Sequence, residues 1–314
     1  MIRKVSTKEM SREEWLEVRR KSIGGSDAAS ILGLNPYNSA YAIWCEKTGK
    51  ITPEDISSKE AVRLGNDLEQ YAAERWMEAT GKKVRRENSI IYNDRYPFAH
   101  ANPDRMVIGE KAGLECKTTS SWEVAKQLKE GEIPPYWYCQ CVHYMMVTGA
   151  DRWYLGALAF GEGFFEFTIE RDEAEIASLS TCEKEFWDFV VNDQSPTLDG
   201  SEATTEALKT IYKESSPGTL ADLTAVGSNI AYYNEISKQI KDLEAIKAEQ
   251  ENIIKDYMGD REKGSFGNTT ISWKSSSRRT FDKSAYEADH GKISDHYYNT
   301  TSVRTFRVTV KKGA

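Results

Sequence analysis

In the segment NPDRMVIGEKAGLECK, residues 102–117, the types and spacing of Asp104, Glu115 and Lys117 could support chemistry. Side chains alternate between the faces of a strand, so Glu115 and Lys117 share one face and Cys116 lies on the other. If the glycine-containing stretch between forms a hairpin turn, Asp104 on the preceding strand comes near Glu115. Adjacent carboxylates repel unless they share a proton or bind a cation, and oxygen ligands favour Mg²⁺ or Mn²⁺. The segment therefore predicts a metal site, in which Lys117 would hold a water molecule or stabilise charge on a phosphoryl group.

An ordinary salt bridge is the alternative interpretation of these charges. An acid and a base on one strand face at the protein surface are common, and such a pair contributes under about 1 kcal/mol. The Glu-Cys-Lys triplet alone is typical of that pair, and the aspartate after Pro103 is what makes a metal site an equal alternative. Both interpretations stay open on these residues alone.

A third acid could join the site from a helix. Glu69 lies in RLGNDLEQYAAERW, where apolar residues recur at spacings of three and four. A glutamate among Leu64, Leu68 and Trp76 is costly to bury without a partner. Glu69 either reaches solvent at the edge of the helix or contributes another carboxylate to the metal site.

The segment WLEVRRKSIGGSDAASILG could bind a phosphate. Arg19 is predicted near the end of one helix, and Gly24, Gly25 and Ser26 lead into the next, whose free N–H groups attract anions. The guanidinium and the serine hydroxyl would complete a phosphate pocket. The alternative is that Ser26 is a plain N-cap and that the glycines only form the turn.

The segment YWYCQCVHYMMVTG is predicted to be a helix with Gln140 and His143 one turn apart. Most of its aromatic residues are expected to pack in the core. Gln140 could hydrogen-bond a nucleotide or orient Lys117.

Helices are predicted to position the residues of the first half. The first begins with Ser11 as N-cap and Glu14 in a capping box. The helical patterns cover residues 11–21, 26–33, 40–48 and 58–80.

Strands dominate from residue 83 onward, and the first three are predicted to form an antiparallel meander. These three cover residues 84–94, 96–108 and 111–119. A helix over 135–148, strands over 152–159 and 163–170, and a helix over 172–192 follow. This order predicts an α/β (α+β) fold with a mixed central sheet flanked by helices.

The segment QSPTLDGS, residues 194–201, predicts a boundary between a domain over 1–200 and a C-terminal extension over 201–314. A long helix over about 223–257 has apolar residues near a 3.5-residue period, which favours packing on another helix or on a partner chain. The final segments SFGNTTISWK and SVRTFRVTVK alternate as two strands and predict a small β module.

The charge of the chain is unevenly distributed. The 314 residues carry a net charge of −7, which argues at first against a nucleic-acid partner. Residues 1–200 have 25 basic and 33 acidic side chains, whereas residues 265–314 have 9 basic and 4 acidic ones. A basic C-terminal end is therefore attached to an acidic body, and acids gathered to hold cations would make a body acidic without repelling DNA.

The remaining composition is typical of a cytoplasmic globular protein. Hydrophobic residues make up 39% and charged residues 29%. No run reaches the length of a membrane helix, and the N-terminus lacks the apolar core of a signal peptide. The five cysteines form no CxxC pair and the four histidines are dispersed, so neither a disulfide framework nor a zinc or iron–sulfur site is predicted.

Together these motifs resemble the YqaJ-type viral recombinase family, the branch of the PD-(D/E)xK nuclease superfamily that contains the phage lambda exonuclease. The resemblance covers about residues 10–195. The motifs occur in the family's order: WLEVRRKSIGGSDAASILG, LGNDLE, NPDRM with GLECK, and QCVHYMMVTG.

This resemblance implies a restriction-endonuclease-like core and a Mg²⁺-dependent exonuclease of bacterial or phage type, with Mn²⁺ as a substitute. Such an enzyme degrades the 5′ strand of linear double-stranded DNA and leaves a 3′ overhang for a single-strand annealing protein of the RecT or Bet type. Asp104, Glu115 and the carbonyl of Cys116 would hold metal, usually two ions.

The resemblance also implies roles for the remaining residues. Glu69 would complete the acidic cluster, and Lys117 would orient the attacking water. Arg19 and Ser26 would anchor the 5′ phosphate, and Gln140 would lie near the active site. The lambda-like relatives form rings of three, which predicts a homo-oligomer.

Two departures from the family pattern limit the resemblance. The helix reads QCVH where two glutamines are expected, and the chain continues for more than a hundred residues beyond the core. An endonuclease on the same fold is one alternative. A non-catalytic module that binds a recombination partner is the other.

Overall fold

The structure is a computed structural model that describes residues 1–53, 55–301 and 303–309. It divides into two compact units, the first over Met1–Lys213 and the second from Glu214 onward. The first unit extends past the predicted boundary at residue 200, because α8 (Glu202–Ile211) belongs to it. Thr204 and Ala207 on α8 are buried, and the Thr204 hydroxyl donates to Ser39 Oγ at 2.8 Å.

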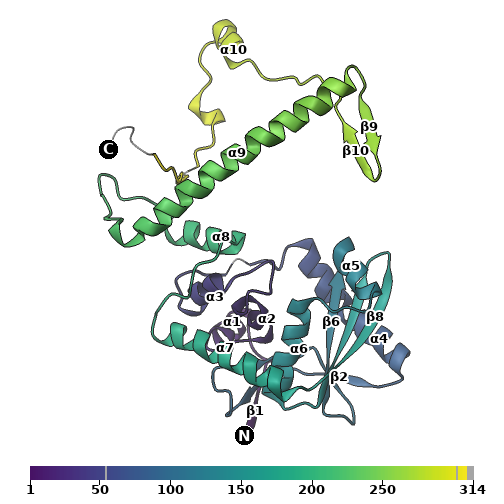
Figure 1. Cartoon of the computed structure of the whole chain (residues 1–314). Helices are drawn as coiled ribbons and strands as arrows, with labels where there is room; N and C mark the ends of the chain where they lie inside the picture. The colour runs from purple at the N-terminus through teal and green to yellow at the C-terminus, as the bar shows by residue number, and fades with distance from the viewer. Residues whose placement is uncertain (54, 302, 310–314) are drawn as a thin grey trace. The chain divides into compact units, whose positions relative to one another are not determined.

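A five-stranded mixed sheet forms the centre of the first unit (Figure 1). Only the two central neighbours, β6 and β7, run parallel, and every other pair in this sheet is antiparallel. The strand order is β2 (Val84–Arg86), β5 (Arg105–Val107), β6 (Ala112–Thr119), β7 (Arg152–Ala159) and β8 (Gly163–Glu170).

Helices cover both faces of this sheet. Adjacent residues Trp153 and Tyr154 on β7 point to opposite faces, and they lie in different core clusters. Tyr154 packs with Trp76 of α4 (Glu60–Thr80), whereas Trp153 packs in the cluster of α6 (Pro135–Thr148). The predicted fold class, a mixed central sheet flanked by helices, is therefore confirmed.

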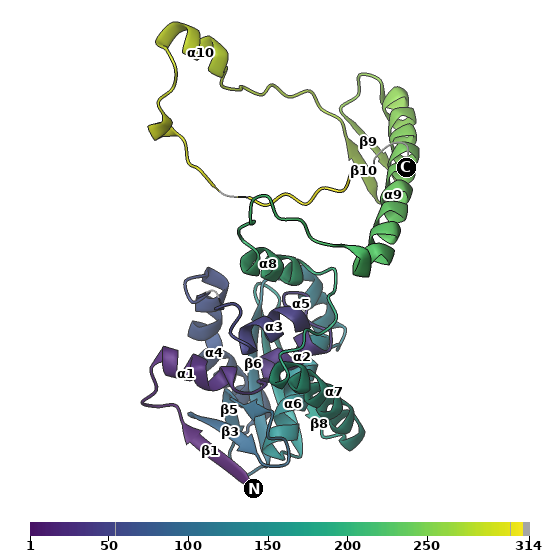
Figure 2. The ribbon, with the colours of Figure 1, turned by 90° about the vertical axis from the view of Figure 1, so that its left-hand side faces the viewer.

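A separate three-stranded sheet corrects the predicted meander. Its order is β1 (Ile2–Ser6), β3 (Ser89–Asn93) and β4 (His100–Ala101), and Figure 2 shows β1 beside β3 at the edge of the unit. The predicted strand over 84–94 is thus divided into β2 and β3, and the one over 96–108 into β4 and β5. In both cases the two parts belong to different sheets. Pro103 interrupts the second of them between β4 and β5, since a proline cannot donate to a sheet ladder. Strand β1 was not predicted.

The predicted helices of the first unit are present with small shifts. Helix α1 (Arg12–Arg20) has the predicted capping box at Ser11 and Glu14. Helix α2 (Gly25–Ile31) begins with Gly24 as N-cap, so Ser26 is not the N-cap. Helices α3 (Ala40–Lys47) and α7 (Glu173–Val191) match the prediction.

Helix α5 (Trp122–Lys129) was missed, although its N-cap could be read from the sequence. The Ser121 side chain accepts from Val124 N–H, and Val124, Ala125 and Leu128 are buried against β7.

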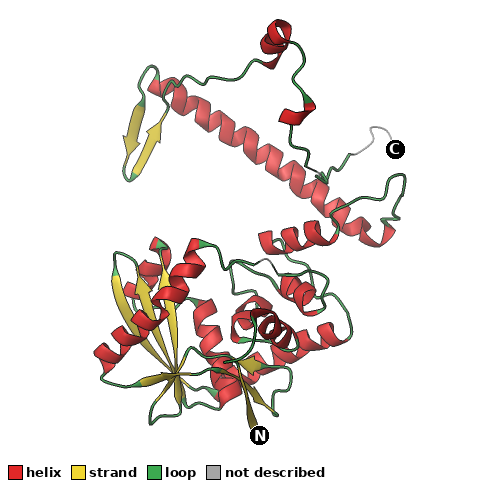
Figure 3. Ribbon diagram, turned by 180° about the vertical axis from the view of Figure 1, so that it is seen from behind, coloured by secondary structure: helices red, strands yellow, loops and turns green. Residues whose placement is uncertain are grey.

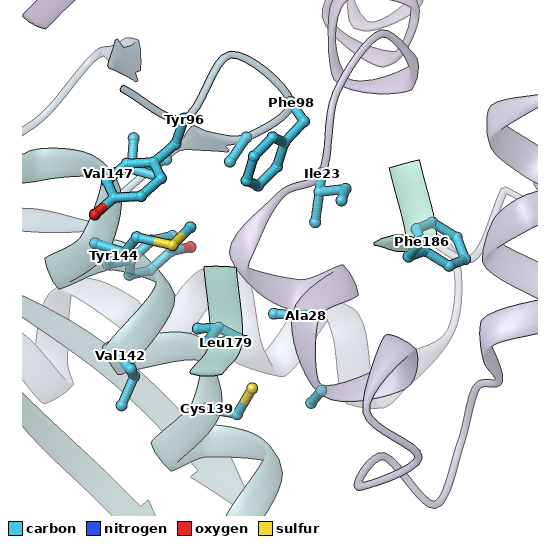
Figure 4. Packing of buried hydrophobic residues seen from close by; sticks show 14 of the residues in the cluster. Ile23, Ala28, Tyr96, Phe98, Cys139, Val142, Tyr144, Val147, Leu179 and Phe186 are labelled. Atoms are coloured by element: carbon cyan, nitrogen blue, oxygen red, sulfur yellow. The ribbon is translucent and has the colours of Figure 1, made fainter. Parts of the chain in front are cut away.

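The largest core lies where α2, α6 and α7 meet. Ile23, Tyr144 and Leu179 come from distant parts of the chain and pack together there (Figure 4). This core fixes the start of α2 against α6, which matters for the site described below.

The second unit contains the predicted long helix, α9 (Gly227–Met258), shown in Figure 3 with a short hairpin beyond its end. The predicted strand SFGNTTISWK is a hairpin of β9 (Lys263–Phe266) and β10 (Thr269–Ser272), because Gly267 turns the chain with φ 55°. Helix α10 (Lys283–His290) follows. Of the last predicted strand, residues 303–309 have no regular structure and the other positions lie outside the described residues.

Within the described part of the chain, no helix has the length and apolarity that a membrane span requires.

Candidate active site

The β5–β6 hairpin brings Asp104 to Glu115, as the sequence predicted. The strands pair Met106 with Gly113 and Arg105 with Leu114, and the chain turns at Gly109 with φ 86°. Continuing this register places residue 104 opposite residue 115. The N–H of Cys116 donates to Asp104 Oδ2 at 2.9 Å, which fixes the carboxylate against the edge of β6.

Glu115, Lys117 and Gln140 form a closed triangle of hydrogen bonds. Lys117 Nζ lies 2.7 Å from Glu115 Oε1 and donates to Gln140 Oε1 at 2.8 Å. Gln140 Nε2 donates to the same Glu115 oxygen at 2.7 Å. The salt bridge of the alternative interpretation exists, but it is not a surface pair, because the two side chains are only 22% and 4% exposed.

The electrostatics of this cluster favour an added cation. Burial, together with the negative charges of Glu115 and Glu69, raises the pKa of Asp104 well above its usual value. Burial alone would lower the pKa of Lys117, but Glu115 and Asp104 outweigh it and the pKa is raised. Lys117 is thus held as a cation between two acids that still repel each other.

The oxygen atoms in the cluster fit Mg²⁺. Glu115 Oε2 is buried and has no hydrogen-bond partner among the residues that the structure describes. The carbonyl of Cys116 points to the same edge as its N–H, toward Asp104. Two carboxylate groups and a carbonyl give an all-oxygen donor set, which is what Mg²⁺ takes when waters and substrate phosphate complete its shell.

Glu69 lies beside this set but faces another partner. Its carboxylate pairs with Arg105, whose Nη2 also donates to Gln70 at 3.1 Å. Over the described residues, no three side chains of His, Cys, Asp or Glu are grouped to hold a metal. The oxygen set therefore consists of Asp104, Glu115 and the Cys116 carbonyl, with Glu69 at its border.

Arg19 and Ser26 also come together. Arg19 Nη2 donates to Ser26 Oγ at 2.7 Å, and the guanidinium lies 4.5 Å from the Trp15 ring. Ser26 is exposed in the first turn of α2.

Gly25 allows the Arg19–Ser26 pair to lie beside the triangle of Glu115, Lys117 and Gln140. A Cβ on Gly25 would lie 2.6 Å from the Tyr144 ring and 3.1 Å from Gln140 Cγ, so α2 can reach α6 only because this residue has no side chain. Gln140 therefore contacts both the start of α2 and the Glu115–Lys117 pair.

Comparison with known proteins identifies the chain. The family model described as "YqaJ-like viral recombinase domain" matches residues 14–151. "Uncharacterized protein YqaJ" of Bacillus subtilis (strain 168) is 43% identical over 270 residues, which cover 85% of this chain and 84% of that protein. The chain belongs to the YqaJ-like viral recombinase family. Every predicted site residue of this YqaJ-like chain, from Arg19 to Gln140, lies within the matched range.

Other similar proteins are more distant. Protein D345L of African swine fever virus (strain Badajoz 1971 Vero-adapted) is 57% identical over 35 residues, which cover 11% of this chain and 10% of that protein. Among solved structures, an alkaline exonuclease (LHK-Exo) from Laribacter hongkongensis is 22% identical with a TM-score of 0.49. The match covers 58% of this chain and 93% of that one.

The structure of this YqaJ-like chain adds residues that the motifs did not reveal. The Tyr144 hydroxyl accepts from Gln140 Nε2 at 2.9 Å and donates to the Asn102 carbonyl at 3.3 Å. Tyr144 follows Gln140 by four residues, a spacing that could have indicated a shared helix face. Arg105, the partner of Glu69, carried no such signal.

His143 faces away from the site. Its Nδ1 lies 2.6 Å from Glu183 Oε1 on α7, and its Nε2 lies 2.8 Å from the carbonyl of His100 on β4. In this YqaJ-like chain His143 therefore connects α6 to α7 and β4, and it does not point toward a substrate.

Proposed function

We propose that this chain is a Mg²⁺-dependent exonuclease that degrades the 5′ strand of linear double-stranded DNA. The observation behind the proposal is the cluster of half-buried Asp104 and Lys117 around buried Glu115, one of whose carboxylate oxygens has no hydrogen-bond partner among the described residues. Membership of a viral recombinase family supports DNA as the substrate. The 3′ overhang would pass to a single-strand annealing protein, and we expect both to act in the cytoplasm.

In this proposal each residue has a distinct task. Asp104, Glu115 and the Cys116 carbonyl would hold Mg²⁺, or Mn²⁺ in its place, with two ions expected from the resemblance. The metal, when bound, stabilises negative charge and lowers the pKa of a bound water. Lys117 donates a hydrogen bond to the attacking water or to the phosphoryl oxygens. Gln140, which bonds both Glu115 and Lys117, keeps their side chains oriented.

Arg19 and Ser26 would set the direction of attack. A guanidinium and a hydroxyl can bind a terminal phosphate by charge-assisted hydrogen bonds. Because Gly25 holds the start of α2 against Gln140, a 5′ phosphate bound at Arg19 would lie beside the cutting site. The first phosphodiester of the 5′ strand is then the one presented for hydrolysis.

A pair of substrates tests the proposal. Linear and covalently closed circular duplexes of the same sequence are incubated with the protein and Mg²⁺, and we expect only the linear form to disappear. Lys117→Ala should reduce digestion of the linear form by at least about a hundredfold, since it removes a cation from the reacting centre. Lys129→Ala is the matched control, because Lys129 forms an exposed pair with Glu162.

The other outcomes identify the alternatives. Cutting of the circle would favour an endonuclease on the same fold. No cutting of either substrate would favour a module that binds a recombination partner through the second unit. Near wild-type digestion by Lys117→Ala would remove Lys117 from the catalytic assignment.

A further inference from the structure

His100 is a buried histidine with one ring nitrogen left unsatisfied. The residue lies on β4 and is 1% exposed. Its Nδ1 is 2.8 Å from Ser22 Oγ, but its Nε2 has no hydrogen-bond partner among the described residues. A buried polar atom without a partner is unfavourable for folding, so a folded protein that keeps one needs a physical or functional reason for it.

The unsatisfied nitrogen points at Gly24, beside Arg19. A Cβ on Gly24 would lie 3.0 Å from His100 Nε2 and 3.5 Å from Arg19 Nη2, so both atoms lie close to Gly24. The φ of Gly24 is −97°, which any residue can adopt. Glycine is therefore needed here for room and not for backbone conformation.

Charged and aromatic groups surround the ring of His100. It is faced by the cations Arg19 and Lys47, by Asp27 and His143, and by the Tyr92 ring at 6.1 Å. Asp27 is already engaged, since its Oδ2 lies 2.6 Å from Lys47 Nζ and accepts from the Gly24 N–H.

Burial and the Arg19 charge lower the pKa of His100 well below its usual value, so the ring is neutral at neutral pH. When the Ser22 hydroxyl donates to Nδ1, the ring hydrogen resides on Nε2.

With that tautomer the region next to Gly24 offers three donors: the Arg19 guanidinium, the Ser26 hydroxyl that is bonded to it, and the His100 Nε2–H. The Ser26 oxygen accepts from Arg19 at 2.7 Å, which leaves its own hydrogen free for a ligand. A group of donors with one net positive charge suits an anion with several oxygen atoms.

We propose that His100 Nε2–H is a third donor of the terminal-phosphate anchor and that it favours a phosphate monoester over an internal diester. This inference rests on the proposed role of Arg19 and Ser26. A terminal monoester has an additional free oxygen and a charge of about −1.5 to −2, so an additional donor selects the DNA end. The half-buried Arg19 side chain lies beside Gly24, where a strand end can reach it from solvent.

Binding without cleavage tests the proposal. Two linear duplexes that differ only in a 5′ phosphate or a 5′ hydroxyl are titrated in chelator, with fluorescence anisotropy as the readout. The measured quantity is the ratio of the two dissociation constants. We expect the wild-type chain to bind the phosphorylated end more tightly.

A matched pair of variants separates the two ring nitrogens. His100→Asn keeps a polar atom for Ser22 and removes Nε2, and it should lower the ratio by roughly tenfold, as for loss of one hydrogen bond to a charged group. His100→Gln keeps a donor near the Nε2 position and should retain most of the preference. Gly24→Ala keeps all three donors but sets a methyl group against His100 Nε2 and Arg19 Nη2, so it should lower the ratio as well. Thermal melting of each variant checks that it is folded.

The outcomes distinguish this inference from the function on which it rests. If the wild-type chain does not prefer the phosphorylated end, the anchor role of Arg19 fails and this inference fails with it. If Arg19→Ala abolishes the preference while folded His100→Asn leaves it unchanged, only the role of His100 is wrong. An unchanged ratio in Gly24→Ala would also overturn it, because the phosphate would then lie elsewhere.

Discussion

At the scale of single residues, the site holds two carboxylate groups that repel each other, and a bound cation would reduce this repulsion. Half-buried Asp104 lies beside buried Glu115, and Glu115 Oε2 lacks a partner within the described part of the chain. Removing an isolated carboxylate from water is costly, so such a pair persists where a cation or a function compensates. Lys117 supplies one positive charge, which is less than the two carboxylates require.

Replacing Asp104 by asparagine should therefore stabilise the metal-free protein. The pKa of Asp104 is raised in the fold above its ordinary value of 3.8, so the folded state binds more protons in the pH range above 3.8. Stability then falls as pH rises through that range. Asparagine does not ionise, so Asp104→Asn removes this loss of folding stability. A tenfold difference in proton affinity between the folded and unfolded states corresponds to about 1.4 kcal/mol. Chemical denaturation in chelator at pH 7 measures the expected gain of about 1–2 kcal/mol.

Added Mg²⁺ provides the second half of this prediction. Wild-type protein should melt at a higher temperature with Mg²⁺, and Asp104→Asn should lose most of that increase together with DNA cleavage. Asp94→Asn is the control, since Asp94 is exposed and pairs with the N-terminus. An Asp104→Asn variant that is less stable than the wild type in chelator would contradict this prediction.

At the scale of elements, one buried ion pair connects β4, α6 and α7. Burial alone would lower the pKa of His143, but Glu183 at 2.6 Å and the His100 carbonyl outweigh it and raise the pKa. Both ring nitrogens face acceptors, which suits the protonated imidazole. This pair positions the strand that carries His100, and thereby the region around Gly24.

The His143–Glu183 pair should make stability depend on pH. A raised histidine pKa gives stability that is fully present below its ordinary value of 6.5 and is lost as pH rises through the folded value. Glu183→Gln should cost about 3 kcal/mol at pH 6, because it leaves a buried charge without its partner. The cost should shrink at higher pH.

Denaturation of the wild type and of Glu183→Gln at pH 6 and pH 8.5 measures this difference. Glu185→Gln is the control, because Glu185 is the exposed glutamate two positions away on the same helix. An equal loss of stability at both pH values would show that His143 does not titrate with the fold.

At the scale of the whole molecule, the chain consists of two units that differ in how far they bury their apolar residues. The first contains every proposed site residue and all three buried clusters. In the second, apolar residues of α9 stay largely exposed, among them Ile240 at 50%, Leu243 at 65% and Ile246 at 56%. We expect this helix to pack on a partner, either another copy of the chain or another protein.

The first unit should fold and cut DNA without the second. Residues 1–213 are expected to unfold in one cooperative transition and to digest linear duplex at a rate within about threefold of the whole chain, since the core and the site are internal to this unit. Circular dichroism melts and the linear-versus-circular assay measure both properties. Truncation at residue 200 is the informative comparison, because it removes α8 and exposes the surface that Thr204 and Ala207 cover. Equal stability of the two truncated chains would contradict the boundary at Lys213.

Local patterns determined the parts of this protein that depend on neighbours in the chain. Strand alternation placed Glu115 and Lys117 on one face, and the turn before Gly113 brought Asp104 to them. Helical spacing predicted α6 and α9, and alternation predicted β7 and β8. These features follow from backbone geometry within one element or one hairpin, which a sequence displays directly.

Only the tertiary structure decided how distant segments meet. Gln140 reaches Glu115 and Lys117 because α6 packs beside the sheet, and Glu69 pairs with Arg105 because α4 packs on the other face of the same sheet. The division of the predicted meander into two sheets and the unsatisfied nitrogen of His100 are likewise results of packing. No periodicity specifies these distances, since they depend on which side chains fill the space between elements far apart in the chain.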